Sequence, residues 1–103
     1  MRKRRVVFNF GVAADTPSEK LKKIPQMIKE IVNEIKLAEF GRAHFSEFGD
    51  FTLNFEVVYY VKTPDYDKFM DIKQAINLGL VETFERENIV MPYPTQSVLL
   101  KKD

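Results

Sequence analysis

The sequence contains no cysteine, which excludes disulfides, thiolate metal ligands and cysteine nucleophiles together. Its single histidine, His44, is too little for a histidine metal site or a Ser-His-Asp triad, so we expect an ordinary surface or edge role for it. Glycine is scarce, with 4 among 103 residues, and the segment FNFGVAAD lacks the repeated glycines of a phosphate-binding loop. Together these absences predict a protein that is not an enzyme and has no cofactor or metal.

Long apolar runs and a strong net charge are also missing. The longest nearly uninterrupted apolar stretch, Val6 to Ala14, falls far short of the roughly 20 residues that a transmembrane helix needs. The formal net charge of +1 gives no overall attraction to nucleic acid or anionic lipid, and a solvated linker or strand edge accounts for the basic run Arg2 to Arg5. With 45% hydrophobic residues, the chain is expected to fold as one soluble domain.

The first third of the chain predicts a strand followed by a helix. Apolar residues alternate over residues 6–12, which is the period of a strand with one buried face. Thr16 and Glu19 predict the helix start, with Thr16 as N-cap and Glu19 completing a capping box. Pro25 lies inside the helix, so we expect a kink or a restart near 23–25. The expected buried stripe is Leu21, Ile24, Ile28, Ile31 and Ile35.

A hairpin is predicted in the middle of the chain. Its first strand begins near Arg42 and is expected to be short, and Gly49-Asp50 marks the turn. In the following strand, residues 51–61, the odd positions are apolar and should face the helices. The opposite face of that strand is polar at first but turns apolar at Val58 and Tyr60. This face should therefore be partly adhesive.

A second helix should begin after Thr63-Pro64-Asp65. Asn88 suits the left-handed position that follows such a helix, with Ile89 as the usual apolar contact, and Ile89 to Met91 would form a short last strand at most. The helix repeats apolar residues at a spacing of three and four, and this buried stripe is Phe69, Ile72, Ile76, Leu80 and Phe84.

These elements give the order βαββαβ, which predicts an α+β, ferredoxin-like plait with two helices on one face of a mainly antiparallel sheet. RNA-binding modules share this plait and carry basic residues, glycine and stacking aromatics on its third strand. Here the third strand presents Thr52, Asn54 and Glu56, with only Tyr60 to stack, and Glu56 would repel phosphate. We therefore expect no nucleic acid, although a free-standing module that binds nucleic acid or a small regulatory ligand stays open as the alternative.

The segment IVMPYPTQSVLL contains two strand-like apolar runs that are separated by prolines. Pro92 and Pro94 have no N–H to donate, so neither can lie inside a paired ladder. One sheet cannot easily contain both runs. The second run, with its unpaired backbone groups, would favour pairing with another chain.

Three segments carry a resemblance to a known family: RRVVFNFGVAADTP, FSEFGDFTLNFEVVYYV and ENIVMPYPTQSVLL. In this order and spacing they resemble the cytoplasmic C-terminal domain of small-conductance mechanosensitive ion channels, from about Arg4 to Leu100. Asn88 stands where the family commonly has glycine, and it tolerates the same left-handed conformation. The family's transmembrane helices and small β domain, which precede this plait, are not in the sequence, so the chain resembles an isolated domain with Met1 added.

The resemblance implies a function in assembly and filtering. Seven such domains in the family form a hollow vestibule on the cytoplasmic side of the cell membrane, through whose openings solutes pass and whose state is linked to gating and inactivation. The expected partners are thus other copies of the chain, in a heptamer, together with the missing transmembrane and β domains of the same protein. Residues 96–101 would join equivalent segments of other subunits in a small barrel, unless 97–100 folds back as the fourth strand of its own sheet.

The sequence therefore divides into three parts: residues 1–4 as a linker, 5–91 as the plait, and 92–103 as the Pro-Tyr-Pro segment with a possible oligomer strand. Val58 and Tyr60 should be covered by another subunit or by the returning tail. The full predicted oligomer interface is Val58, Tyr60, Pro92, Tyr93, Pro94, Val98, Leu99 and Leu100.

Overall fold

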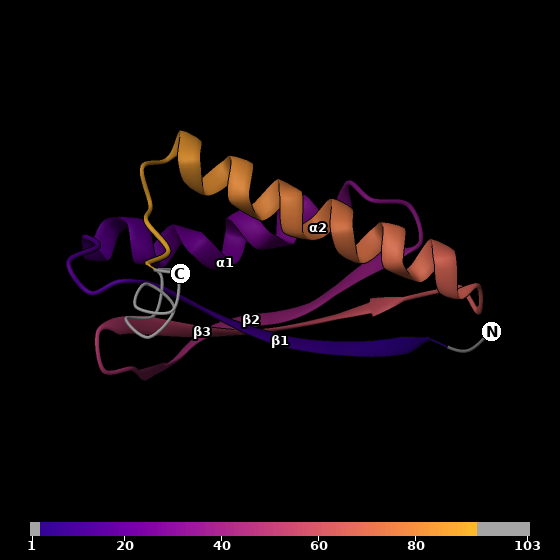
Figure 1. Cartoon of the computed structure of the whole chain (residues 1–103), viewed down its shortest axis with the longest axis horizontal. Helices are drawn as coiled ribbons and strands as arrows, with labels where there is room; N and C mark the ends of the chain where they lie inside the picture. The colour runs from indigo at the N-terminus through magenta and orange to yellow at the C-terminus, as the bar shows by residue number, and fades with distance from the viewer. Residues whose placement is uncertain (1–2, 93–103) are drawn as a thin grey trace, which may run out of the picture.

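The computed structural model describes residues 3–92, which form two helices packed on one face of a three-stranded sheet (Figure 1). The sheet is antiparallel throughout, and its strand order is β1-β3-β2. The predicted α+β architecture is confirmed, whereas any strand after Pro-Tyr-Pro lies outside the described residues. The elements in chain order are β1 (Arg4–Ala13), α1 (Ser18–Asn33), β2 (Ala38–Phe48), β3 (Thr52–Val61) and α2 (Tyr66–Arg86).

The expected short strand at Ile89 to Met91 is not formed. One backbone hydrogen bond stands in its place, donated by the Ala13 N–H to the Val90 carbonyl over 2.8 Å. Pro92 lacks an N–H and follows directly, so it cannot extend this pairing along β1. Within residues 3–92, β1 and β2 are consequently the two edges of the sheet.

Aromatic rings fill the core where the sheet meets the helices. Phe55 of β3 is fully buried between Phe10 of β1 and Phe45 of β2, with ring centroids 5.3 and 5.4 Å away. Phe84 of α2 meets Phe10 edge-on at 5.5 Å. Because β3 is the central strand, its odd positions from Phe55 to Val61 are all buried, as the alternation predicts. Leu53 is only partly buried, and Phe51, which was expected to face the helices, lies before the strand and is 77% exposed.

The helices bury the faces that their apolar spacing predicts, with one shift. All five members of the α2 stripe are buried. In α1, Ile24 and Ile28 are fully buried as expected, but the third fully buried residue is Val32. Leu21, Ile31 and Ile35, which lies just beyond the helix, are only partly covered. Ile31 instead faces α2, where a Cβ on Gly79 would lie 2.9 Å from its Cγ2, so the glycine allows the two helices to approach closely.

The predicted capping box at the start of α1 is wrong. Pro17 is the N-cap residue, and no side chain caps this helix. The Thr16 hydroxyl donates instead to the Ala13 carbonyl over 2.7 Å, and the Thr16 N–H donates to the same oxygen. Threonine thus closes the turn after β1, which is the local competition that makes Ser and Thr favour turns as readily as caps.

The expected restart at Pro25 is also wrong, since α1 is one helix from Ser18 to Asn33. A proline inside a helix removes one donor and crowds the carbonyl four residues earlier. Ile24 and Ile28 on either side of it are fully buried, so tertiary packing stabilises the helix across the proline, and the kink expected as the alternative stays a prediction.

The first hairpin strand is longer than its sequence indicates. β2 begins at Ala38, not near Arg42, and its 11 residues make it longer than β3. Register shifts between Phe40 and Arg42 and between Phe45 and Glu47 break the alternation, which concealed the first half of this strand. The predicted turn is confirmed, and the Gly49 N–H donates to the Thr52 carbonyl over 2.8 Å.

The end of α2 follows the prediction closely. Asn88 adopts φ 60°, the Asn88 N–H donates to Glu85, and the Ile89 N–H donates to Phe84 over 2.8 Å. These two bonds form the Schellman motif, and Ile89 is buried behind it. This motif directs the residues that follow the helix towards the end of β1.

We expect Asn88→Val to lower the free energy of unfolding by about 1–2 kcal/mol, because a β-branched residue is strained in the left-handed region. Asn88→Gly should unfold at the same urea concentration as the parent chain or a higher one. Urea titration of both variants checks this, and equal midpoints for the valine and glycine variants would contradict it.

Candidate interaction surfaces

The sheet face that points away from the helices carries two of the predicted interface residues. Val58 is only 2% exposed, because it lies on the central strand between Val7 and Arg42, its partners in register. Tyr60 is half-buried on the same face. Another subunit would therefore meet Tyr60 and the exposed Val7 here, and not Val58 itself. That this face is covered in an assembly stays a prediction.

Tyr60 is held in place by residues from both neighbouring strands. Lys3 places its Nζ 5.5 Å from the Tyr60 ring centroid and also pairs with Glu39 at 3.1 Å. A Cβ at Gly41 would lie 3.1 Å from the Tyr60 ring and 2.7 Å from the Val58 carbonyl oxygen. Glycine at this bulge therefore leaves room for the tyrosine ring.

One ion pair on this face joins β2 to β3 and is open to solvent. Arg42 and Glu56 form an ion pair at 3.0 Å, and His44 lies opposite Glu56 in register with its side chain exposed. Such an exposed pair contributes little to stability. His44 thus has the surface position on an edge strand that the sequence predicts.

The turn between β2 and β3 presents a surface that the sequence analysis missed. Phe48 is 78% exposed and Phe51 is 77% exposed, and we call this pair the aromatic knob. The Phe48 ring packs edge-on against the Phe45 ring, with their centroids 5.2 Å apart. The turn residues around Gly49 were interpreted only as a turn, yet the aromatic residues on either side of Gly49-Asp50 could have revealed the knob.

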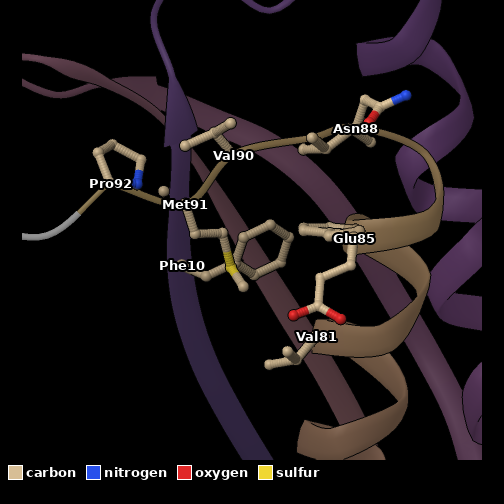
Figure 2. A pocket seen from close by; sticks show the side chains of 10 residues that line it. Phe10, Val81, Glu85, Asn88, Val90, Met91 and Pro92 are labelled. Carbon is tan, nitrogen blue, oxygen red and sulfur yellow. The ribbon is translucent and has the colours of Figure 1, made fainter.

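A groove of about 730 Å³ lies at the β1 edge of the sheet, between the end of β1 and the end of α2 (Figure 2). Figure 2 shows the Met91 side chain beside the Phe10 ring, with Val81 and Glu85 projecting from α2. Its floor is mostly apolar. We call this the end groove, and its lining residues are Phe10, Gly11, Val81, Phe84, Glu85, Asn88, Ile89, Val90, Met91 and Pro92.

Only part of the predicted interface can be placed. Pro92 is exposed and lines the end groove. Tyr93, Pro94, Val98, Leu99 and Leu100 lie outside the described residues, so their role stays a prediction. Sequence reasoning did not identify the groove, because its walls come from two segments, residues 10–11 and 81–92, that are far apart in the chain.

One buried ionisable group has a shifted pKa. Tyr59 is 1% exposed beneath the helices, where its ring meets Phe8 edge-on at 5.9 Å. Burial disfavours the phenolate and raises the pKa of Tyr59 to about 12. The group stays neutral at physiological pH and acts as core material.

Within residues 3–92, no cluster of three or more His, Cys, Asp or Glu side chains is arranged to hold a metal ion. The helices of that same region include none that is long and apolar enough to cross a bilayer.

Comparison with known proteins identifies the class of protein to which this chain belongs. Residues 6–91 match the family described as "Mechanosensitive ion channel MscS, C-terminal", so the chain belongs to the MscS family and contains its C-terminal domain. In solved structures, MSL1 of Arabidopsis thaliana matches with a TM-score of 0.78 at 11% identity, covering 91% of this chain and 35% of that one. At this identity the likeness shows the fold alone.

Two relatives from Methanocaldococcus jannaschii agree with this assignment. The small-conductance mechanosensitive channel MscMJ is 41% identical over 102 residues, which cover 98% of this chain. The large-conductance mechanosensitive channel MscMJLR is 37% identical over 104 residues, which cover 96% of this chain. This chain spans 29% of the length of each relative.

Proposed function

We propose that this chain is the cytoplasmic vestibule domain of a mechanosensitive channel, which assembles with copies of itself, filters solutes and takes part in gating-linked behaviour. The observation that carries the proposal is the family match over residues 6–91. The 41% identity to a mechanosensitive channel along nearly the whole chain supports it. The missing membrane part would hold the copies together at high local concentration, in a ring of seven as the resemblance implies.

The alternative, a free-standing plait that binds nucleic acid, has little support from the surface. On the open face of β3, Glu56 is already paired with Arg42. Tyr60, the one aromatic residue there, is partly covered by Lys3 and packed beside Gly41. A base would have to displace these contacts before it could stack.

The C-terminal segment should provide part of the self-association. We expect that deleting Pro92 to Asp103 leaves the circular dichroism spectrum of the domain unchanged but lowers the average mass measured by light scattering. The reason is that the core stripes lie in β1 to α2, whereas the tail adds its apolar residues beyond a proline break.

A full-length variant with Val98, Leu99 and Leu100 changed to serine is the matched control, because it keeps the chain length while removing the apolar side chains. It should associate as weakly as the truncated chain. If the intact chain is monomeric at high concentration, or if truncation unfolds the domain, the tail belongs to its own sheet and this part of the proposal fails.

A further inference from the structure

The aromatic knob and the end groove are complementary in chemistry. The knob presents two phenylalanine rings that are more than three-quarters exposed, and isolated apolar groups of that size are costly to leave in water. The end groove offers Phe10, Val81 and Met91 as an apolar lining. We propose that the aromatic knob of one copy inserts into the end groove of a neighbouring copy. This inference rests on the proposed function and names the contact through which copies associate.

The placement of the two surfaces supports a second copy as the occupant. The knob lies at the turn that joins β2 to the central strand β3, and the groove lies between β1 and the end of α2, so they are two different surfaces of the domain. Both lie at one end of the domain, because Ala13 pairs with Thr52 next to the turn (Figure 1). A contact between two different surfaces repeats from copy to copy, and it closes into a ring when the rotation allows.

The size of the contact indicates a neighbour that is held nearby and not a freely diffusing partner. A buried phenylalanine covers about 150–250 Å², so the two rings and a matching area of the groove together would bury at most about 600–1,000 Å². A stable interface between separate proteins needs about 1,200–2,000 Å². The knob alone would therefore bind weakly, and it would work between copies whose tether supplies a concentration of about 1 mM.

Cysteine cross-linking tests the contact directly, because the natural chain has no thiol. Chains with Asp50→Cys, beside the knob, are mixed at about 1 mM with chains carrying Glu85→Cys, on the groove wall, and then oxidised. Both natural residues are exposed, and neither substitution removes a ring of the knob. We expect the mixed 50–85 dimer to exceed random pairing several-fold.

Two variants of the Asp50→Cys chain separate the contact from chance collision. Changing Phe48 and Phe51 to serine should return the mixed dimer to random pairing, with circular dichroism confirming the fold. Tyr66→Ser removes an aromatic residue of similar exposure elsewhere on the surface and should leave the excess intact. Random pairing in the parent mixture, or an excess of 50–50 dimers, would overturn the proposal.

Light scattering on the unlinked chain distinguishes this failure from failure of the proposed function. A chain that associates, but shows no excess of mixed dimers, assembles through another surface. A chain that does not associate and pairs at random argues against both statements.

Discussion

Replacing Phe55 with alanine should lower the free energy of unfolding by about 3–5 kcal/mol, enough to unfold a domain of ordinary stability. Phe55 is fully buried on the central strand, and its ring stacks on Phe10 at an interplanar angle of 4°. Its other side packs against Phe45, so the change opens a cavity that no neighbouring ring can fill without leaving another.

Urea unfolding followed by circular dichroism measures this effect. Phe51→Ala is the matched control, since it makes the same chemical change four residues earlier on a side chain that is 77% exposed. Its stability should stay within about 0.5 kcal/mol of the parent chain. Similar losses in the two variants would show that the core is not centred on Phe55.

The second large effect is a loss of stability at alkaline pH through Tyr59. Its pKa is raised to about 12 in the folded state by burial, from the ordinary value of 10. The folded protein therefore favours the neutral phenol, so this stabilisation is complete below pH 10 and is lost as the pH rises through about 12. Two pKa units correspond to about 2–3 kcal/mol.

The measurement compares denaturant stability at about pH 9 and about pH 12 in the parent chain and in Tyr59→Phe. The quantity of interest is the difference between the two proteins, because it cancels effects of alkaline pH that both share. Tyr59→Phe should lose about 2–3 kcal/mol less than the parent. Tyr66→Phe, which removes an exposed phenol, is the control, and an equal loss in all three proteins would refute the assignment to Tyr59.

Local patterns in the sequence predicted most of the fold, because burial in the core requires apolar residues to recur at the period of each helix or strand. The α2 stripe and the odd positions of β3 from Phe55 to Val61 repeat apolar residues at the period of their element, and the structure buries them accordingly. Two failures occurred where local chemistry has more than one solution. Thr16 closes a turn where a cap was predicted, and the bulge at Gly41 conceals the start of β2 because it interrupts the alternation on which a strand is recognised.

The candidate surfaces were harder to predict, because surfaces are made by distant segments. Val58 looked adhesive in its strand, yet the two flanking strands already bury it. The end groove needs Phe10, Val81 and Met91 together, and nothing in the separation of these residues along the chain indicates that they meet. The knob, in contrast, is local, and an aromatic pair around a polar turn is a signal that can be read from sequence.

The single hydrogen bond between Ala13 and Val90 has a mechanical consequence. It fixes the end of the described chain beside the last residue of β1, while the chain enters the domain at Arg4, the first residue of that strand. Ten residues of β-strand at about 3.3 Å each separate these points by roughly 30 Å. Segments joined at the two ends would thus be spaced by the stiffest direction of the sheet. A force applied between these two ends would then act along β1, and it would load the pairing of β1 with β3 in shear.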